Sequence, residues 1–218
     1  MNELKHFEPI EKNTYEIKKE NIIPLYSLPE DFSEDLKSLD WPLEVQGTGR
    51  LLEDNKNFEI RYPKGDMFYS WAVVFHELGH LLQDKLSLKI KIEENDQTKA
   101  ILKEEDAFVR GLGRVQKYCP DILEVLDERF NYYKKQGKLP SFNSFTELYK
   151  DFFKIIKINE TLNVLKEGES ELEALEKVNI QSFFNDIEDN KVGVTIDEEE
   201  VELVVLKVVD KLIEEQAV

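Results

Sequence analysis

The chain has 218 residues, of which 41% are hydrophobic and 11% aromatic, enough for a packed core in one domain or in one domain with an appendage. Its 29 basic and 46 acidic residues give a net charge of −17, which argues against nucleic acid and anionic membranes as partners. The single cysteine, Cys119, excludes an internal disulfide framework. The charged N-terminus lacks an apolar signal region and no apolar run reaches membrane-spanning length, so we expect a cytoplasmic protein.

The N-terminal quarter of the chain predicts loops followed by a hairpin. Residues 1–40 contain three prolines and an acidic cluster, and we expect loop with a short helix there. Residues 43–52 predict a strand with an irregularity that glycine permits, and residues 58–62 alternate strictly and predict a second strand. Residues 58–62 are expected to be either an ordinary sheet strand or a strand at a cleft edge that pairs with an extended peptide.

Helical patterns dominate from residue 67 onward. The predicted helices cover residues 67–86, 98–118, 121–136, 144–157, 170–187 and 197–216, and residues 192–196 predict a short strand. We therefore expect an α+β fold in which a small mixed sheet or hairpin packs on the helix at 67–86, with a mainly helical C-terminal half. The predicted division is a domain over 1–140 and a helical region over 141–218, which can belong to the same domain.

The helix predicted at 67–86 contains the segment His76-Glu77-Leu78-Gly79-His80, which has the HExxH pattern of zinc hydrolases. Residues i and i+4 share a helix face, so the two imidazoles can hold one Zn²⁺ at roughly 2.0–2.1 Å. The surrounding sequence is apolar, and an isolated buried carboxylate is costly unless it has a partner or serves a metal site. The pattern thus predicts Glu77 as the general base of a metal-dependent hydrolysis. The alternative is a core helix with two hydrogen-bonded histidines.

A catalytic zinc site has three protein ligands and one open position, so a third ligand is needed. The longer version of the motif is excluded, because Leu86 stands where it requires His or Asp and Gln83 stands where it requires Gly. The best donor is Glu104 in the helix predicted at 98–118, since the residues on its helix face are small and would let the two helices approach closely: Ala100, Ala107 and Gly111. Glu105 lies on a different face and is either the alternative ligand or a partner of a ligand.

Metal-bound histidines usually need a hydrogen-bond partner on the second ring nitrogen. Asp84 and Asp106 are the candidates for that role in the sequence. Stabilisation of an oxyanion would need a further donor, and the candidates are Tyr69, Arg110, Tyr132 and Tyr133.

These segments resemble a known family. Residues 73–82 resemble the active-site helix of zincin metallopeptidases, and residues 104–108 resemble the Glu-x-x-Ala segment of gluzincins, closest to the ImmA/IrrE-like small intracellular peptidases. The resemblance covers about residues 45–115 and implies one Zn²⁺ held by His76, His80 and Glu104, with Glu77 as the base. One departure is Phe108, which stands where many gluzincins have an Asp that supports the site.

The expected function is that of a zinc metallopeptidase acting on a protein or peptide substrate. Because ImmA/IrrE-like proteins are often paired with repressors or antitoxins, the resemblance also implies a regulatory protein as partner. A catalytically silent binding or regulatory protein with the zincin fold is the alternative. A purely structural zinc site would need a fourth protein ligand, which would be His6, Cys119 or another carboxylate.

Overall fold

The computed structural model describes residues 16–25, 47–51, 57–85, 96–154, 185 and 189–216. These residues form a mixed α+β fold with a small sheet and a majority of helix, which confirms the predicted fold class in that form. The elements are the strands β1 (Glu16–Leu25), β2 (Thr48–Leu51) and β3 (Asn57–Pro63), the helices α2 (Met67–Lys85), α3 (Asp96–Tyr118), α4 (Pro120–Lys135) and α7 (Glu198–Gln216), and a helix over 145–154.

The helices agree with the sequence prediction to within two residues wherever both ends are described. The helix predicted at 170–187 lies outside the described residues except for residue 185. The short strand predicted at 192–196 is reduced to a single antiparallel bridge between Asp66 and Thr195.

The sheet has the strand order β1-β3-β2, with β3 parallel to β1 and antiparallel to β2. The predicted hairpin is therefore confirmed for its described residues. The prediction that residues 58–62 offer an edge to a peptide is wrong, because neighbouring strands occupy both edges of β3. As the alternation predicts, one face of β3 is buried through Phe58, Ile60 and Tyr62.

The expectation of loop and short helix before residue 40 is wrong for residues 16–25, which form β1. The pairing with β3 shifts between Ile17 and Ile22, so this strand is irregular where it carries Lys18, Lys19 and Glu20. Ile22 follows Ile17 by an odd number of positions, which would place the two side chains on opposite faces of a regular strand, yet both are buried. The irregularity explains why no period-two pattern is visible in the sequence.

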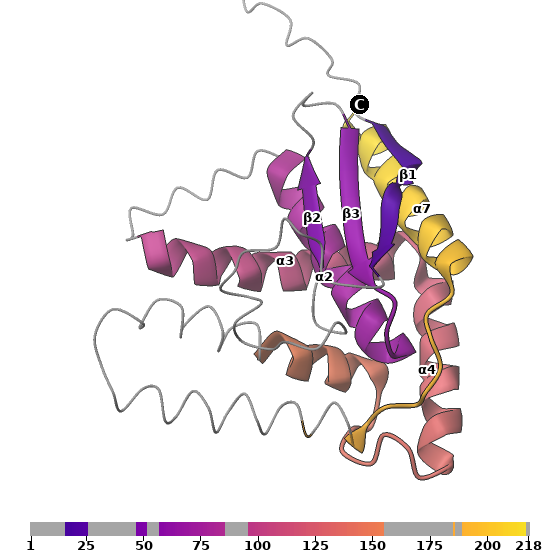
Figure 1. Ribbon diagram of the computed structural model, residues 1–218. Coiled ribbons are helices and arrows are strands. Elements are labelled where there is room, and N and C mark those ends of the chain that lie inside the picture. The colour runs from indigo at the N-terminus through magenta and orange to yellow at the C-terminus, as the bar shows by residue number, and fades with distance from the viewer. Residues whose placement is uncertain are drawn as a thin grey trace, which may run out of the picture.

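Helix α2 packs against β2 and β3, and α3 crosses α2 (Figure 1). Asp66 fixes the start of α2, because one carboxylate oxygen accepts a hydrogen bond from the backbone N–H of Phe68 at 3.3 Å. The other oxygen accepts from the backbone N–H groups of Val192 at 2.6 Å and Gly193 at 3.1 Å. The helix that carries the HExxH segment is thus tied to the C-terminal part of the chain.

The crossing of α2 and α3 is so close that glycine is required on both helices. A Cβ atom built on Gly79 would lie 1.9 Å from the carbonyl oxygen of Ala107, and one built on Gly111 would lie 1.8 Å from the carbonyl oxygen of Phe75. These neighbours are backbone atoms, which cannot move aside without separating the helices. The predicted close approach through small residues is confirmed, and it brings residue 104 to the HExxH segment.

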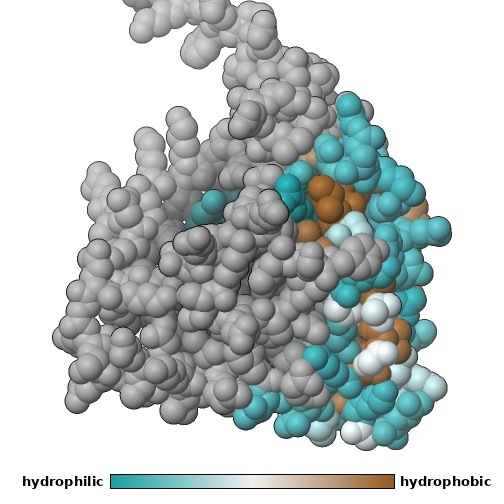
Figure 2. Space-filling model, viewed as in Figure 1, coloured by the Kyte–Doolittle hydropathy of each residue, from teal (hydrophilic) through white to brown (hydrophobic). Residues whose placement is uncertain are grey.

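A single cluster of buried side chains extends from the sheet through α2 and α3 to α7. The apolar face predicted on the last helix packs there, with Val201, Val205 and Val208 fully buried. On the face seen in Figure 2 the described surface is mainly hydrophilic, with small apolar areas between. None of the described helices is both long and apolar enough to span a bilayer.

The helix crossing predicts that replacing two glycines by alanine has opposite effects on stability. Gly79→Ala places a methyl group against the backbone of α3, and we expect it to lower the free energy of unfolding by about 1–3 kcal/mol, as overpacking does. Gly113→Ala is the matched control, since a Cβ atom at that position would have no neighbour within 4 Å; it should raise stability by about 0.5–1 kcal/mol. Denaturant unfolding of both variants tests this, and a neutral Gly79→Ala would contradict the close crossing.

Candidate metal centre

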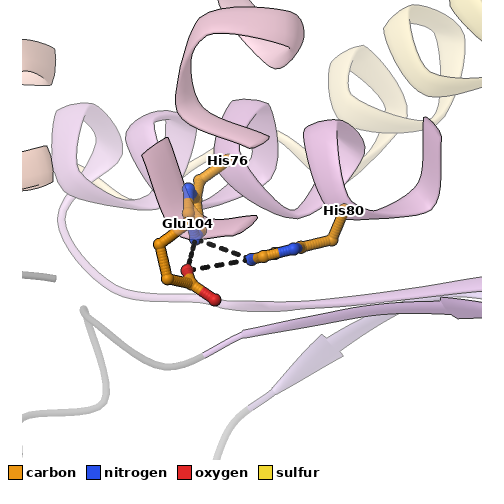
Figure 3. A group of neighbouring side chains, drawn as sticks. All are labelled: His76, His80 and Glu104. Atoms are coloured by element: carbon orange, nitrogen blue, oxygen red, sulfur yellow. Dashed lines mark hydrogen bonds and ion pairs between the residues drawn. The ribbon is translucent and has the colours of Figure 1, made fainter. Parts of the chain in front are cut away.

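Three side chains meet where α2 and α3 cross. His76 and His80 project from successive turns of α2 and Glu104 projects from α3, so that all three point toward one another (Figure 3). The Oε2 atom of Glu104 lies 2.9 Å from Nε2 of His76 and 3.0 Å from Nε2 of His80. The two Nε2 atoms are 3.0 Å apart. One carboxylate oxygen and two ring nitrogens therefore converge on a single point.

The donor set fits a metal ion. His76, His80 and Glu104 form a group whose ligand atoms lie within 4.8 Å of one another, and it is the one group of this kind among the described residues. Tetrahedral ligands at roughly 2.0–2.1 Å from a zinc ion lie about 3.3 Å apart, so an expansion of a few tenths of an ångström would admit the ion. The structure brings Glu104, and not Glu105, to the histidines. A fourth protein ligand does not join this group within the described residues.

Glu77 lies beside this group without belonging to it. Glu77 is 8% exposed, and burial raises its pKa above the ordinary value of a glutamate, an effect that His76 and His80 partly oppose. Strand β2 closes over it, because a Cβ atom on Gly49 would lie 2.1 Å from the carbonyl oxygen of Glu77, and the backbone of Gly49 makes a hydrogen bond to the Glu77 carboxylate. Glu77 is thus a buried carboxylate whose affinity for a proton is raised.

The contacts within the site also shift the pKa values of His80 and Glu104. Burial by itself would lower the pKa of His80, but the hydrogen bond to Glu104 and the charges of Glu77 and Glu104 outweigh it and raise the pKa of His80 to about 9. Burial by itself would raise the pKa of Glu104, but the hydrogen bonds from His76 and His80 lower it well below its usual range. The two carboxylates thus create a strong demand for positive charge at this point.

The second ring nitrogens of the two histidines have different surroundings. Nδ1 of His80 lies 3.0 Å from Oε1 of Gln83, whereas the buried Nδ1 of His76 has no hydrogen-bond partner within the described part of the chain. Asp106, one of the predicted partners of a ligand, accepts a hydrogen bond from Nε2 of Gln83 at 2.8 Å and is linked to His80 through that side chain. The side chain of Asp84 lies outside the described residues. Sequence reasoning missed Gln83, although its position one turn after His80 on the same helix could have identified it.

The structure brings none of the four candidate oxyanion donors into the His–His–Glu group. Tyr132 and Tyr133 line a cavity beside Met67 at the start of α2, nine residues and roughly 13 Å along the helix from His76. Arg110 is engaged by Asp106 at 2.6 Å. Tyr69 is buried in the core.

Two other residues named from the sequence are also accounted for. Cys119 is buried at the end of α3, with its sulfur 3.9 Å from the carbonyl oxygen of Val204, and takes no part in the His–His–Glu group. Phe108, the departure from the gluzincin pattern, stacks on Tyr149 with ring centroids 4.2 Å apart and on Phe153 at 4.4 Å. Phe108 therefore contributes to the packing of α3 against the helix over 145–154. His6 lies outside the described residues.

The raised pKa of His80 predicts that metal affinity depends on pH. Below pH 9 a metal ion must displace the proton of His80, so the apparent zinc association constant should rise with pH from 6.5 to 8.5, by up to about tenfold per unit. Competition with a chromophoric chelator in zinc-buffered solutions measures this. An affinity that stays constant over this range would contradict the assignment of that proton to the site.

Comparison with known proteins adds no family to this description, because no protein-family model, curated protein or solved structure matches the chain.

Proposed function

We propose that the protein is a zinc-dependent metallopeptidase of the gluzincin type. The observation that carries the proposal is the convergence of two histidine nitrogens and one glutamate oxygen within hydrogen-bonding distance of one another, with a buried carboxylate beside them. Two histidines, one glutamate and an open fourth position form a known catalytic zinc site. The absence of a fourth protein ligand from the group, within the described residues, favours a catalytic over a structural metal.

His76, His80 and Glu104 would hold the ion. When bound, zinc would polarise a substrate carbonyl and make a water molecule more acidic. Glu77 would accept the proton of the attacking water, for which its raised pKa suits it, and would pass that proton to the leaving amine. Its burial under β2 keeps bulk water from competing for this carboxylate.

Strand β2, rather than β3, is the strand suited to pair with an extended peptide. It pairs with β3 on one side, and within the described residues no strand pairs with its other side. It also passes directly over Glu77 at Gly49. A peptide added to that edge would lie beside the strand that covers Glu77, which favours proteins or peptides with an extended segment as the substrate class.

The mechanism predicts that Glu77→Gln keeps zinc but loses hydrolysis. The amide preserves the size of the side chain and cannot accept the water proton, so cleavage of a peptide library by the zinc-loaded protein should fall by about 10²–10⁴-fold. Mass spectrometry of new N-termini measures cleavage, and elemental analysis measures zinc. Full cleavage by Glu77→Gln would remove Glu77 from the mechanism.

A pair of neighbouring variants separates ligand loss from loss of charge. Glu104→Ala should lose zinc, whereas Glu105→Ala removes the same charge one position away and should retain it. A zinc-loaded wild type that cleaves no peptide in the library would favour the silent binding protein instead.

A further inference from the structure

Gln83 connects His80 to helix α3 through a continuous series of hydrogen bonds. Its Oε1 atom lies 3.0 Å from Nδ1 of His80. Its Nε2 atom donates to Oδ2 of Asp106 at 2.8 Å and to the backbone carbonyl of Lys103. Asp106 in turn accepts from Nε of Arg110 at 2.6 Å. The residues that hold the amide nitrogen of Gln83 thus lie on both sides of Glu104 on the same helix.

The direction of these hydrogen bonds follows from the chemistry of the groups. The carboxylate of Asp106, held by Arg110, and the carbonyl of Lys103 can only accept hydrogen bonds. The NH₂ group of Gln83 must therefore face them, which leaves its oxygen toward His80. Because that oxygen can only accept, Nδ1 of His80 must carry the proton, and the lone pair of Nε2 is free to bind a metal ion that takes the place of the second proton.

His76 lacks an equivalent arrangement. It is almost fully buried, its ring stands edge-on to Phe152, and its Nδ1 atom has no partner in the described part of the chain. Packing therefore holds the ring of His76. His80 is more exposed, with 13% of its side chain accessible, and has the hydrogen bond to Gln83 instead.

We propose that Gln83, anchored by Asp106 and Lys103, is a positioning residue that sets the tautomer and the ring orientation of His80 for metal binding. The proposal rests on the proposed function, since it assumes that His80 is a ligand. It assigns a role to the residue that replaces the glycine of the longer zinc motif. Gln83 supplies a hydrogen-bond partner for Nδ1 of His80, which a glycine at this position of α2 could not do.

The test compares zinc affinities of variants by chelator competition. Gln83→Leu removes the acceptor at similar size and should weaken zinc binding by about 10–100-fold, the usual effect of losing such a partner. Gln116→Leu makes the same change at an exposed position of α3 and should leave affinity and stability unchanged. Equal affinities for wild type and Gln83→Leu would overturn the proposal.

A second variant tests the anchor of Gln83. Asp106→Ala removes an acceptor that holds the NH₂ group of Gln83, so the amide oxygen is held less firmly toward His80 and zinc binding should weaken. In the double variant Gln83→Leu/Asp106→Ala the two losses should not add, because both act through the same hydrogen bond to His80, and additive losses would contradict the proposed series.

Nitrogen-15 NMR detects the proton on Nδ1 of His80 directly, and a change in the stability of the fold would not move that proton. With three histidines in the chain, a long-range ¹H–¹⁵N spectrum of the zinc-loaded protein should show His80 protonated at Nδ1 with a slowly exchanging proton. That proton should exchange rapidly in Gln83→Leu. A wild type that binds no zinc would refute the proposed function and the positioning role together. Zinc binding with an unaltered Nδ1 proton in Gln83→Leu would refute the positioning role alone.

Discussion

The backbone contact between α2 and α3 is the constraint on which the candidate site depends. Gly79 and Gly111 remove the side chains that would separate the two helices, and the carbonyl groups of Ala107 and Phe75 occupy the vacated space. Glu104 lies one turn from Ala107 on α3, and His76 and His80 flank Gly79 on α2, so the crossing point is also the point where the three donor atoms converge. Side chains at positions 79 and 111 would push the two helices apart and carry Glu104 away from the histidines.

The charges of the candidate site favour the binding of a cation. Glu77 and Glu104 are two carboxylates in a largely buried position beside two imidazoles. The raised pKa of His80 lets a proton supply part of the positive charge that the carboxylates require. A divalent cation would balance both carboxylates, because its two charges equal theirs. The same groups that raise the pKa of His80 therefore favour a metal ion at this position.

The sequence was most informative where one short pattern dictates one geometry. The HExxH spacing placed His76 and His80 on one helix face, and the small residues around Glu104 indicated a close helix crossing, which the structure contains. The sequence was least informative about the sheet, where pairing between distant strands decides the structure. The strand β1 is concealed by an irregularity between Ile17 and Ile22, and the central place of β3 follows from its partners rather than from its own residues. Gln83 has a visible position in the sequence, but its role depends on Asp106, which reaches it from another helix.

A crystal structure of the zinc-loaded protein, with anomalous diffraction recorded on both sides of the zinc absorption edge, would locate the metal ion directly. We predict one zinc peak at roughly 2.0–2.1 Å from Nε2 of His76, Nε2 of His80 and Oε2 of Glu104, with a fourth position open to solvent or substrate. Zinc at another place in the chain, or a fourth protein ligand that closes the coordination shell, would contradict a catalytic centre at this helix crossing.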